Sequence, residues 1–416
     1  MSTYVKKLVK QAKAASYKLA NLTTTQKNKA LESMAKSLMD NRKAILKENK
    51  KDIEKAIAGK LKSSFIERLS LDDEKLKSMS VSLEEIAKLD DPVGKLISTS
   101  IRPNGIELKK VRVPIGVILI VYEARPNVTS DCSGLLFKTS NVGILRGGKN
   151  SFYSNKIIGR TLTKALKLSG IDFDAFFIVE NTERKIVDEL LKQNEYIDLV
   201  IPRGGETLIR KVVKSSYIPV IKHYKGICHV YVDKDADLEK ALKICVNAKV
   251  QRPSVCNALE TILIHQDVAK EFLPHLKQEF DKYSVQIKAG QKAQKFLKSA
   301  KKATQKDWST EYLDLIVSIK IVKDLKEAIE HINFYGSHHT DAIVTENAAR
   351  ADKFVNTVDS ACCFANISTR FSDGYQFGLG AEIGISTDKL HARGPMGLEE
   401  LTIYKWIAKG NGQLRT

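Results

Sequence analysis

The fold is decided by residues 116–129, GVILIVYEARPNVT, where an apolar run gives way to a polar turn and then to a helix start. Val117–Val121 is a short run rich in β-branched residues, and residues 128–138 can form a helix. A strand followed by a helix is the first half of a parallel βαβ unit with a right-handed crossover. Because the strand is apolar without alternation, we expect a sheet that is covered on both faces.

The same alternation continues downstream in two series. We predict strands at 142–145, 176–179, 197–201 and 218–221, separated by helix-length segments such as 149–168. A second series begins near Gly226, with strands predicted at 229–232, 259–264, 315–321, 342–345 and 363–366, and helices near 237–250, 267–282, 324–333 and 347–356. The pattern therefore predicts two α/β regions.

The flanking segments differ from this pattern. Apolar residues at helical spacing predict helices over residues 1 to about 90, and Thr23 with Gln26 forms a candidate capping box. Ile101–Ile106 is typical of a strand broken by a turn and resumed, which predicts a projecting hairpin. Residues 370–397 are rich in glycine and are expected to be loops, and 401–407 is expected to be a strand.

Length and composition limit the protein class. A chain of 416 residues suits two or three domains, and 43% hydrophobic and 28% charged residues argue against disorder. The polar N-terminus lacks a secretory signal and no apolar run approaches a membrane span, so we expect a cytoplasmic protein without membrane insertion. The six cysteines form no CxxC pair, so neither disulfides nor a metal site are expected.

The chain carries 68 basic and 49 acidic residues, a net charge of +19. The excess is mainly lysine spread along the whole chain, without an arginine-rich tail or an aromatic-interleaved patch. A solvated lysine-rich surface is the plainest interpretation, and a field that attracts anionic substrates is the second. Nucleic-acid binding is the least favoured alternative.

The most informative segment is 251–260, QRPSVCNALE, which places Cys256 in a polar turn between a predicted helix and a predicted strand. A nucleophilic cysteine needs access and a positive field that favours the thiolate. The other five cysteines have the surroundings of small core residues. From spacing alone Cys256 can be either a nucleophile or a turn residue.

Three further segments follow predicted strands. Asn127 opens a helix and could donate its amide to an oxyanion, or could simply serve as a helix cap. Arg146-Gly147-Gly148-Lys149 and Arg203-Gly204-Gly205 share a strand–glycine–helix form, in which backbone amides and cations can hold a phosphate. Neither matches the GxGxxG fingerprint, so these segments alone do not establish a nucleotide site.

Taken together, these segments resemble the aldehyde dehydrogenase superfamily, and within it the gamma-glutamyl phosphate reductase branch. The resemblance runs over nearly the whole chain. It is most specific in a few stretches, which are 112–127, 144–149, 251–260, 333–345 and 368–406, the last including GLGAE at 378–382 and HARGPMG at 391–397.

The resemblance implies an aldehyde-dehydrogenase-like α/β fold: a doubly wound cofactor-binding sheet, an α/β catalytic domain and a β oligomerisation arm. The implied cofactor domain spans 1–94 and 112–225, and the catalytic domain with Cys256 spans 226–365. The arm would combine 95–111 with 385–416, joined through a connecting loop at 366–384. Because such an arm exposes strand edges, we expect a homo-oligomer, at least a dimer.

The resemblance also implies roles for individual residues. Cys256 matches the catalytic cysteine, and Asn127 matches the oxyanion-hole asparagine that acts with the Cys256 backbone N–H. The implied cofactor is NADPH or NADP⁺. The residues implied to hold it come from both α/β regions and are Arg146, Gly147, Lys149, Arg203, Gly204, Gly205 and Glu311. Arg125 and Arg370 are expected to bind the polyanionic substrate.

One departure from the wider superfamily concerns His223. Aldehyde-oxidising relatives carry a glutamate that activates water to hydrolyse the thioester, and His223 stands at the matching position, in HYKG at 223–226. Without a positioned carboxylate base, water attack should be slow, and the thioester should survive to accept hydride. His223 could assist proton handling or only fill a strand end.

The implied activity is that of an oxidoreductase in proline biosynthesis, which reduces L-glutamyl 5-phosphate to L-glutamate 5-semialdehyde and phosphate through a Cys256 thioester. No amino-acid kinase domain is expected in this chain, so a separate glutamate kinase must supply the substrate and could hand it over directly. The alternatives are an aldehyde dehydrogenase that oxidises a free aldehyde, and a basic binding protein without catalysis.

Overall fold

The computed structural model describes residues 2–123 and 125–415, which group into two compact units. The first contains the chain up to Lys222, Gly378–Gly384 and the residues from Met396 on, and the second contains His223–Phe377 and Ile385–Pro395. Within the described residues, no helix combines the length and the apolar character needed to cross a membrane.

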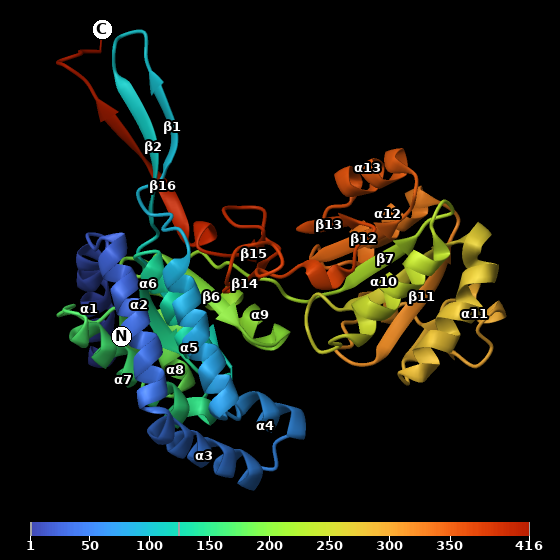
Figure 1. Ribbon diagram of the computed structural model, residues 1–416, viewed down its shortest axis with the longest axis horizontal. Helices are drawn as coiled ribbons and strands as arrows, with labels where there is room; N and C mark the ends of the chain where they lie inside the picture. The colour runs from blue at the N-terminus through green and yellow to red at the C-terminus, as the bar shows by residue number, and fades with distance from the viewer. Residues whose placement is uncertain (1, 124, 416) are drawn as a thin grey trace. The chain divides into compact units, whose positions relative to one another are not determined.

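Five helices open the first unit, as the apolar spacing predicts (Figure 1). They are α1 (Thr3–Leu19), α2 (Thr24–Asp40), α3 (Arg42–Ala58), α4 (Ser63–Leu69) and α5 (Asp73–Lys88). The capping box is confirmed, because the Thr23 hydroxyl accepts from the Gln26 N–H and the Gln26 carboxamide accepts from the Thr23 N–H. These reciprocal bonds satisfy two N–H groups at the start of α2.

The first unit contains a four-stranded parallel sheet in the order β5-β4-β3-β6. Its strands are β3 (Val117–Tyr122), β4 (Val142–Arg146), β5 (Phe176–Ile178) and β6 (Leu199–Arg203), and the helices that follow them are α6 (Asn127–Lys138), η1 (Lys149–Ser151) with α7 (Phe152–Leu168), α8 (Arg184–Leu190) and α9 (Glu206–Ser215). All six residues of β3 are buried, as expected for a strand covered on both faces. The doubly wound sheet is confirmed.

The prediction of a strand at 218–221 is wrong. Only one isolated bridge forms there, between Val200 and Val220. Pro219 has no N–H to donate, so the segment cannot continue a ladder.

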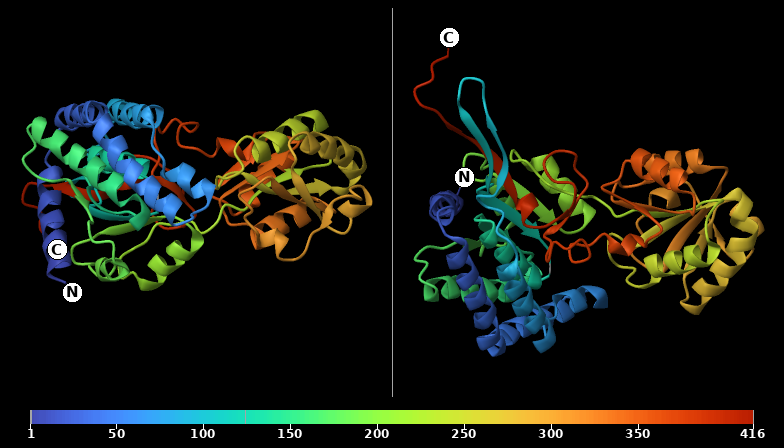
Figure 2. Two further views of the ribbon diagram at one scale, coloured as in Figure 1. Left: turned by 90° about the horizontal axis from the view of Figure 1, so that it is seen from below. Right: turned by 45° about the horizontal axis from the view of Figure 1, so that its top comes forward.

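The second unit is built on a seven-stranded sheet in the order β10-β9-β11-β8-β7-β12-β13, in which all the strands are parallel (Figure 2). The predicted strands are present as β7 (Cys228–Val232), β8 (Leu259–His265), β11 (Ile316–Val322), β12 (Thr340–Val344) and β13 (Cys362–Ala365). The sheet is extended by two strands that were not predicted, β9 (Gln286–Ala289) and β10 (Lys301–Lys302).

Helices cover both faces of this second sheet (Figure 1). One apolar cluster joins the strands to α10 (Leu238–Val250) and α11 (Gln266–Lys282), and a separate cluster joins them to α12 (Leu325–Tyr335) and α13 (Ala348–Thr357). Short 3-10 helices lie in the connections, at η2 (Ala293–Lys295), η3 (Asp307–Ser309) and η4 (Thr369–Phe371).

The predicted hairpin and C-terminal strand form one antiparallel sheet that projects from the first unit (Figure 1). Its order is β1 (Leu96–Ile101), β2 (Glu107–Pro114) and β16 (Thr402–Lys409). Every residue of β1 is exposed, and Trp406 on β16 is 59% exposed. This leaves unpaired strand edges and apolar side chains in contact with solvent.

The boundaries of the two compact units differ in detail from the predicted domain boundaries. The second unit begins at His223 rather than at residue 226, and it includes residues 366–377 and 385–395, which were assigned to the connecting loop and the arm. Side chains of these residues bind the rest of the second unit: Arg370 donates to Gln251, and Lys389 and Arg393 form ion pairs with Asp359. Two short strands, β14 (Gly384–Ser386) and β15 (Gly394–Met396), and η5 (Glu399–Leu401) complete the chain.

Candidate active site

In the first unit, the candidate residues lie after the strands of the sheet. Val121 pairs with Arg146 and Tyr122 pairs with Arg203 in the parallel register. The carboxyl ends of β3, β4 and β6 therefore lie along one side of the sheet, which we call its carboxyl edge. Asn127, Lys149 and Gly205 then begin the helical segments that follow these strands. In doubly wound sheets, this carboxyl edge is where ligands bind.

Asn127 is the first residue of α6, and its side chain is exposed. The helix cap is Pro126, so the alternative of Asn127 as a cap is not what the structure shows. Its amide Nδ2 donates instead to Oδ2 of Asp131, one turn further on, at 2.9 Å. Burial raises the pKa of Asp131 to about 6, against opposing hydrogen bonds from Asn127 and Ser130. Asp131 therefore orients the Asn127 amide.

Arg146 ends β4 with a guanidinium that is largely enclosed. Its Nη1 donates to the Gly147 carbonyl at 3.1 Å and its Nη2 donates to the Thr182 carbonyl at 2.8 Å. Its Nε is buried and has no hydrogen-bond partner among the described residues. Burial, followed by the charge of Arg184, lowers the pKa of Arg146. Arg146 therefore keeps one donor, Nε, unsatisfied by the described residues.

The glycines at these strand ends have different reasons to be glycine. A Cβ on Gly147 would lie 2.0 Å from the Asn155 amide, so packing within the protein excludes any larger residue. A Cβ on Gly204 would lie 2.8 Å from Glu123, whereas a Cβ on Gly205 would meet open space. Of these three glycines, only Gly205 leaves space for the close approach of a ligand.

The start of α9 fits an anionic ligand. Gly205 is its N-cap without a side-chain hydrogen bond, and the Gly205 N–H donates to Glu123 at 3.1 Å. Arg203 contacts the segment at Gly384, while Lys149 is exposed and has no ion pair in the described part of the chain. Helix N-termini and cations together can hold a pyrophosphate. The residues of this edge therefore fit a phosphate-bearing dinucleotide.

In the second unit, Cys256 lies in the turn between α10 and β8 and is half-buried. Its carbonyl accepts from the Cys228 thiol at 3.3 Å. A Cβ on Gly226 would lie 1.8 Å from the same carbonyl oxygen, so only glycine can stand there. The turn that carries Cys256 is thus packed directly on the start of β7.

The other cysteines are held as thiols. Cys132, Cys228, Cys245 and Cys362 are buried and Cys363 is half-buried. Burial raises the pKa of Cys132 to about 12 and of Cys363 to about 11, and it raises the pKa of Cys228 and Cys245 as well. The core role predicted for the other cysteines is therefore confirmed for the four buried ones. Cys363 is only half-buried, so it is a core residue only in part.

Glu311 lies beside the Cys256 turn. Its Oε1 accepts from the Gly226 N–H at 2.7 Å, and Gly226 packs on the Cys256 carbonyl. Although the resemblance places Glu311 only loosely, the structure brings Glu311 and Cys256 together through this one glycine.

Arg370 binds residues at both ends of the Cys256 turn. Its Nε donates to the Gln251 side chain at 2.7 Å and its Nη1 donates to the Asn257 side chain. Asn257 in turn donates to the Ser372 carbonyl at 2.8 Å and accepts from the Thr369 hydroxyl. The predicted substrate arginine therefore also anchors the turn.

His223 is half-buried at the start of the second unit. Its ring lies 5.8 Å from the ring of His339 in an edge-on arrangement, and His339 Nδ1 lies 3.8 Å from the Cys228 sulfur. His223 therefore belongs to the same cluster as Cys256. In the first unit, Arg125 is exposed after β3, in a segment where Ala124 lies outside the described residues.

Two candidate residues were missed from the sequence. Asp131 follows Asn127 by four residues on a helix, a spacing that brings side chains together. Arg252 is exposed in the Cys256 turn, and its charge, second to burial, helps to lower the pKa of Arg370. The signal for Arg252 was its position in the same turn as the cysteine.

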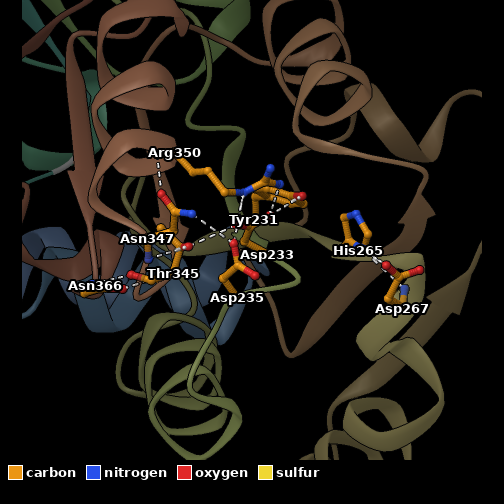
Figure 3. Close-up of polar contacts among 9 residues, drawn as sticks. All are labelled: Tyr231, Asp233, Asp235, His265, Asp267, Thr345, Asn347, Arg350 and Asn366. Atoms are coloured by element: carbon orange, nitrogen blue, oxygen red, sulfur yellow. Dashed lines mark hydrogen bonds and ion pairs between the residues drawn. The ribbon is translucent and has the colours of Figure 1, made fainter.

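The opposite edge of the second sheet has a different character (Figure 3). After β7, Asp233 accepts from Tyr231 at 2.8 Å, from Thr345 at 3.0 Å and from the Arg350 guanidinium. Asn366 joins Thr345 through a pair of hydrogen bonds. This edge is closed by bonds within the protein. Among the described residues, no cluster of His, Cys, Asp or Glu is arranged to hold a metal ion.

Comparison with known proteins places this architecture in a family. The sequence pattern of the "Aldehyde dehydrogenase family" matches residues 2–314. A "Gamma-glutamyl phosphate reductase" of Nautilia profundicola is 49% identical over 99% of this chain and 100% of its own length. A relative of the same name from Caldanaerobacter subterraneus is 50% identical over 98% of each chain.

Solved structures agree with the sequence relatives. The crystal structure of gamma-glutamyl phosphate reductase from Thermotoga maritima has a TM-score of 0.97 and 45% identity, covering 99% of this chain and 100% of that one. An acetylating aldehyde dehydrogenase from Geobacillus thermoglucosidasius, at 16% identity and a TM-score of 0.70, shares the fold over 99% of this chain and 98% of its own. The chain therefore belongs to the aldehyde dehydrogenase family.

Proposed function

We propose that the protein reduces L-glutamyl 5-phosphate to L-glutamate 5-semialdehyde and phosphate with NADPH, the second step of proline biosynthesis from glutamate. The names of relatives at about half identity over the full chain support the substrate. The observation that carries the chemistry is the Cys256 turn, in which Cys256 is half-buried and the turn is fixed by contacts with Gly226 and Arg370. The product cyclises spontaneously toward pyrroline-5-carboxylate.

Cys256 acts as the nucleophile in this proposal. Its thiolate attacks the γ-carbonyl, a carbon–sulfur bond forms, and the carbon–oxygen bond to phosphate breaks. The negative charge that develops on the carbonyl oxygen is stabilised by the Asn127 amide and the Cys256 backbone N–H. Asp131 orients Asn127 for this role through the 2.9 Å hydrogen bond.

The residues at the carboxyl edge of the first sheet are proposed to hold NADPH. When bound, the cofactor supplies the hydride that reduces the thioester carbonyl. Arg146 and Lys149 would bind the adenosine side, while Arg203, Gly204 and Gly205 would form the turn at the pyrophosphate. Gly147 accepts a hydrogen bond from Arg146 through its carbonyl, and Glu311 would bind the nicotinamide ribose.

The choice between reduction and hydrolysis rests on His223. An imidazole stands where aldehyde-oxidising relatives carry a carboxylate base, and here it is packed edge-on against His339. Activation of water at the thioester should therefore be weak, and phosphate should be the acceptor in the reverse reaction. Arg370 in η4 and Arg252 in the Cys256 turn offer positive charge to the polyanionic substrate, and Arg125 is a third candidate.

The partners follow from the arm and from the substrate. Exposed β1 and apolar residues on β16 support pairing with a second copy, so we propose at least a dimer. A separate glutamate kinase would supply the acyl phosphate. We place these reactions in the cytoplasm and expect neither membrane nor nucleic acid among the partners.

The proposal is tested in the reverse direction. Purified protein is incubated with glutamate 5-semialdehyde and NADP⁺, with and without phosphate, and NADPH absorbance is followed. We expect phosphate-dependent NADPH formation that disappears in Cys256→Ala. Steady turnover without phosphate would instead identify an aldehyde dehydrogenase that oxidises a free aldehyde to the acid.

A further inference from the structure

A buried ion pair closes the base of the turn that carries Cys256. Lys249 lies in the last turn of α10 and Glu260 is the second residue of β8, so the pair brackets the whole turn. Lys249 Nζ donates to Glu260 Oε2 at 2.9 Å, and both side chains are fully buried. Burial, the largest influence on each group, lowers the pKa of Lys249 and raises that of Glu260.

Such a pair is a poor device for stability. Desolvation of the two charges offsets most of their attraction, and well-packed apolar residues often serve the fold equally well. We therefore ask whether the pair fixes the local backbone arrangement. The second carboxylate oxygen of Glu260, Oε1, indicates that it does.

Glu260 Oε1 accepts from the Leu313 N–H at 3.1 Å. Leu313 has a φ of 54°, a left-handed conformation that a leucine adopts only when its surroundings hold it there. Two residues earlier, Glu311 Oε1 accepts from the Gly226 N–H at 2.7 Å. One carboxylate thus fixes the segment that presents Glu311.

The contacts form a closed circuit within the second unit. Glu311 binds Gly226, and Gly226 packs on the carbonyl of Cys256, which also accepts from the Cys228 thiol. The chain then returns from Cys256 to Glu260 over four residues. A shift at Glu260 must therefore move the backbone at Cys256 and the carboxylate of Glu311 together.

We propose that Glu260 is a positioning residue that sets the Cys256 backbone relative to Glu311, with Lys249 as its counterion. The inference rests on the proposed function, because that function makes Cys256 the nucleophile and oxyanion donor and gives Glu311 a ribose to bind. Glu260 touches neither substrate nor cofactor in this account and acts through the circuit.

Two double variants of the full chain test this proposal. Lys249→Met/Glu260→Leu and Lys249→Met/Glu260→Gln both remove the two charges, so neither leaves a lone buried charge. Only the leucine variant removes the acceptor for the Leu313 N–H, and the glutamine variant is its matched control. Thermal unfolding checks that both are folded.

The readout is amide hydrogen exchange measured by mass spectrometry on overlapping peptides. We expect exchange at Gly226, which Glu260 does not contact, to be about tenfold faster in the leucine variant than in the glutamine variant. Faster exchange at Leu313 alone would overturn the proposal, because the effect would then be local. Equal exchange at Gly226 in the two variants would also contradict it.

Turnover supplies a second readout. In the phosphate-dependent assay, kcat should fall about tenfold in the leucine variant relative to the glutamine variant, with KM for phosphate nearly unchanged. If the wild-type protein shows no such activity, the proposed function fails while the exchange result still decides the role of Glu260. If the leucine variant does not fold, Glu311→Ala tests the circuit from its other end. Faster exchange over 251–258 would then support the proposal, and unchanged exchange would contradict it.

Discussion

The two parallel sheets of this protein use opposite edges for their candidate residues. In the first sheet, Arg146 ends β4, and Asn127 and Gly205 follow β3 and β6, at the carboxyl edge. In the second sheet, Glu311 precedes β11 and Cys256 precedes β8, at the amino edge. The carboxyl edge of the second sheet is instead filled by the Asp233 network (Figure 3). The rule that ligands bind at the carboxyl ends of parallel strands agrees with the candidate residues of the first sheet and disagrees with those of the second.

The largest expected effect lies at the amino edge of the second sheet. Cys256→Ala should lower turnover by about a thousandfold or more, because no thioester can form. Cys363→Ala is the control, since Cys363 is also half-buried but belongs to β13. Phosphate-dependent NADPH formation measures both. A Cys256→Ala variant that keeps the activity of the Cys363→Ala control would mean that the turn before β8 does not hold the nucleophile.

The carboxyl edge of the second sheet should matter for stability only. Arg350→Met leaves the fully buried Asp233 carboxylate without its cation and should lower the free energy of unfolding by about 3 kcal/mol. Denaturant unfolding measures this change. The folded fraction should keep its kcat, and a selective loss of kcat would show that this edge takes part in the reaction.

The Asp233 network also sets a pH dependence. Burial acts to raise the pKa of Asp233, but hydrogen bonds from Arg350, Tyr231 and Thr345 outweigh it and hold the pKa below its ordinary value of 3.8. The folded protein therefore binds this proton less readily than the unfolded chain does. The stability that it contributes is present above pH 3.8 and is lost as the pH falls further.

At the carboxyl edge of the first sheet, smaller effects on cofactor binding are expected. Lys149→Ala should raise KM for NADP⁺ about tenfold with little change in kcat, because it removes one cation from a phosphate site. Lys164→Ala on α7 removes the same charge from an exposed position of the same unit and serves as the control. Equal changes in both variants would indicate a general effect of net charge.

The smallest effect concerns Asp131, which orients Asn127. Its pKa of about 6 lies above the ordinary value of 3.8, so the folded state retains a proton that the unfolded chain releases between these values. The stability that Asp131 contributes should therefore fall as the pH rises through this window. Asp131→Asn should gain in Tm relative to the wild type between pH 4 and 6, by a few degrees. Parallel pH profiles of Tm would contradict this assignment.

Much of the fold was readable from local pattern. The capping box at Thr23 and the apolar run of β3 each carry their own physical signal, and both are present as predicted. The missed strands β9 and β10 are short and contain lysines. They are strands because each pairs with a neighbour in the sheet, β9 with β11 and β10 with β9. The false strand at 218–221 was apolar enough, but Pro219 removes the donor that a ladder needs.

The candidate site was readable only in part. Cys256, Asn127 and Arg146 stand in segments whose polar character between regular elements marks them. Glu260 also gave a signal, because a carboxylate within a buried strand requires a partner. The identity of that partner, Lys249, and the bond to Leu313 depend on tertiary packing and could not be read from spacing.

The central claim is that Cys256 carries the glutamyl group as a thioester. The most direct test mixes the protein with glutamate 5-semialdehyde and NADP⁺ in the absence of phosphate and follows NADPH, with peptide mass mapping of the product. The account predicts a burst of about one NADPH per subunit, a glutamyl adduct on Cys256, and steady turnover only after phosphate is added. Continuous NADPH formation without phosphate, or an adduct on another residue, would contradict it.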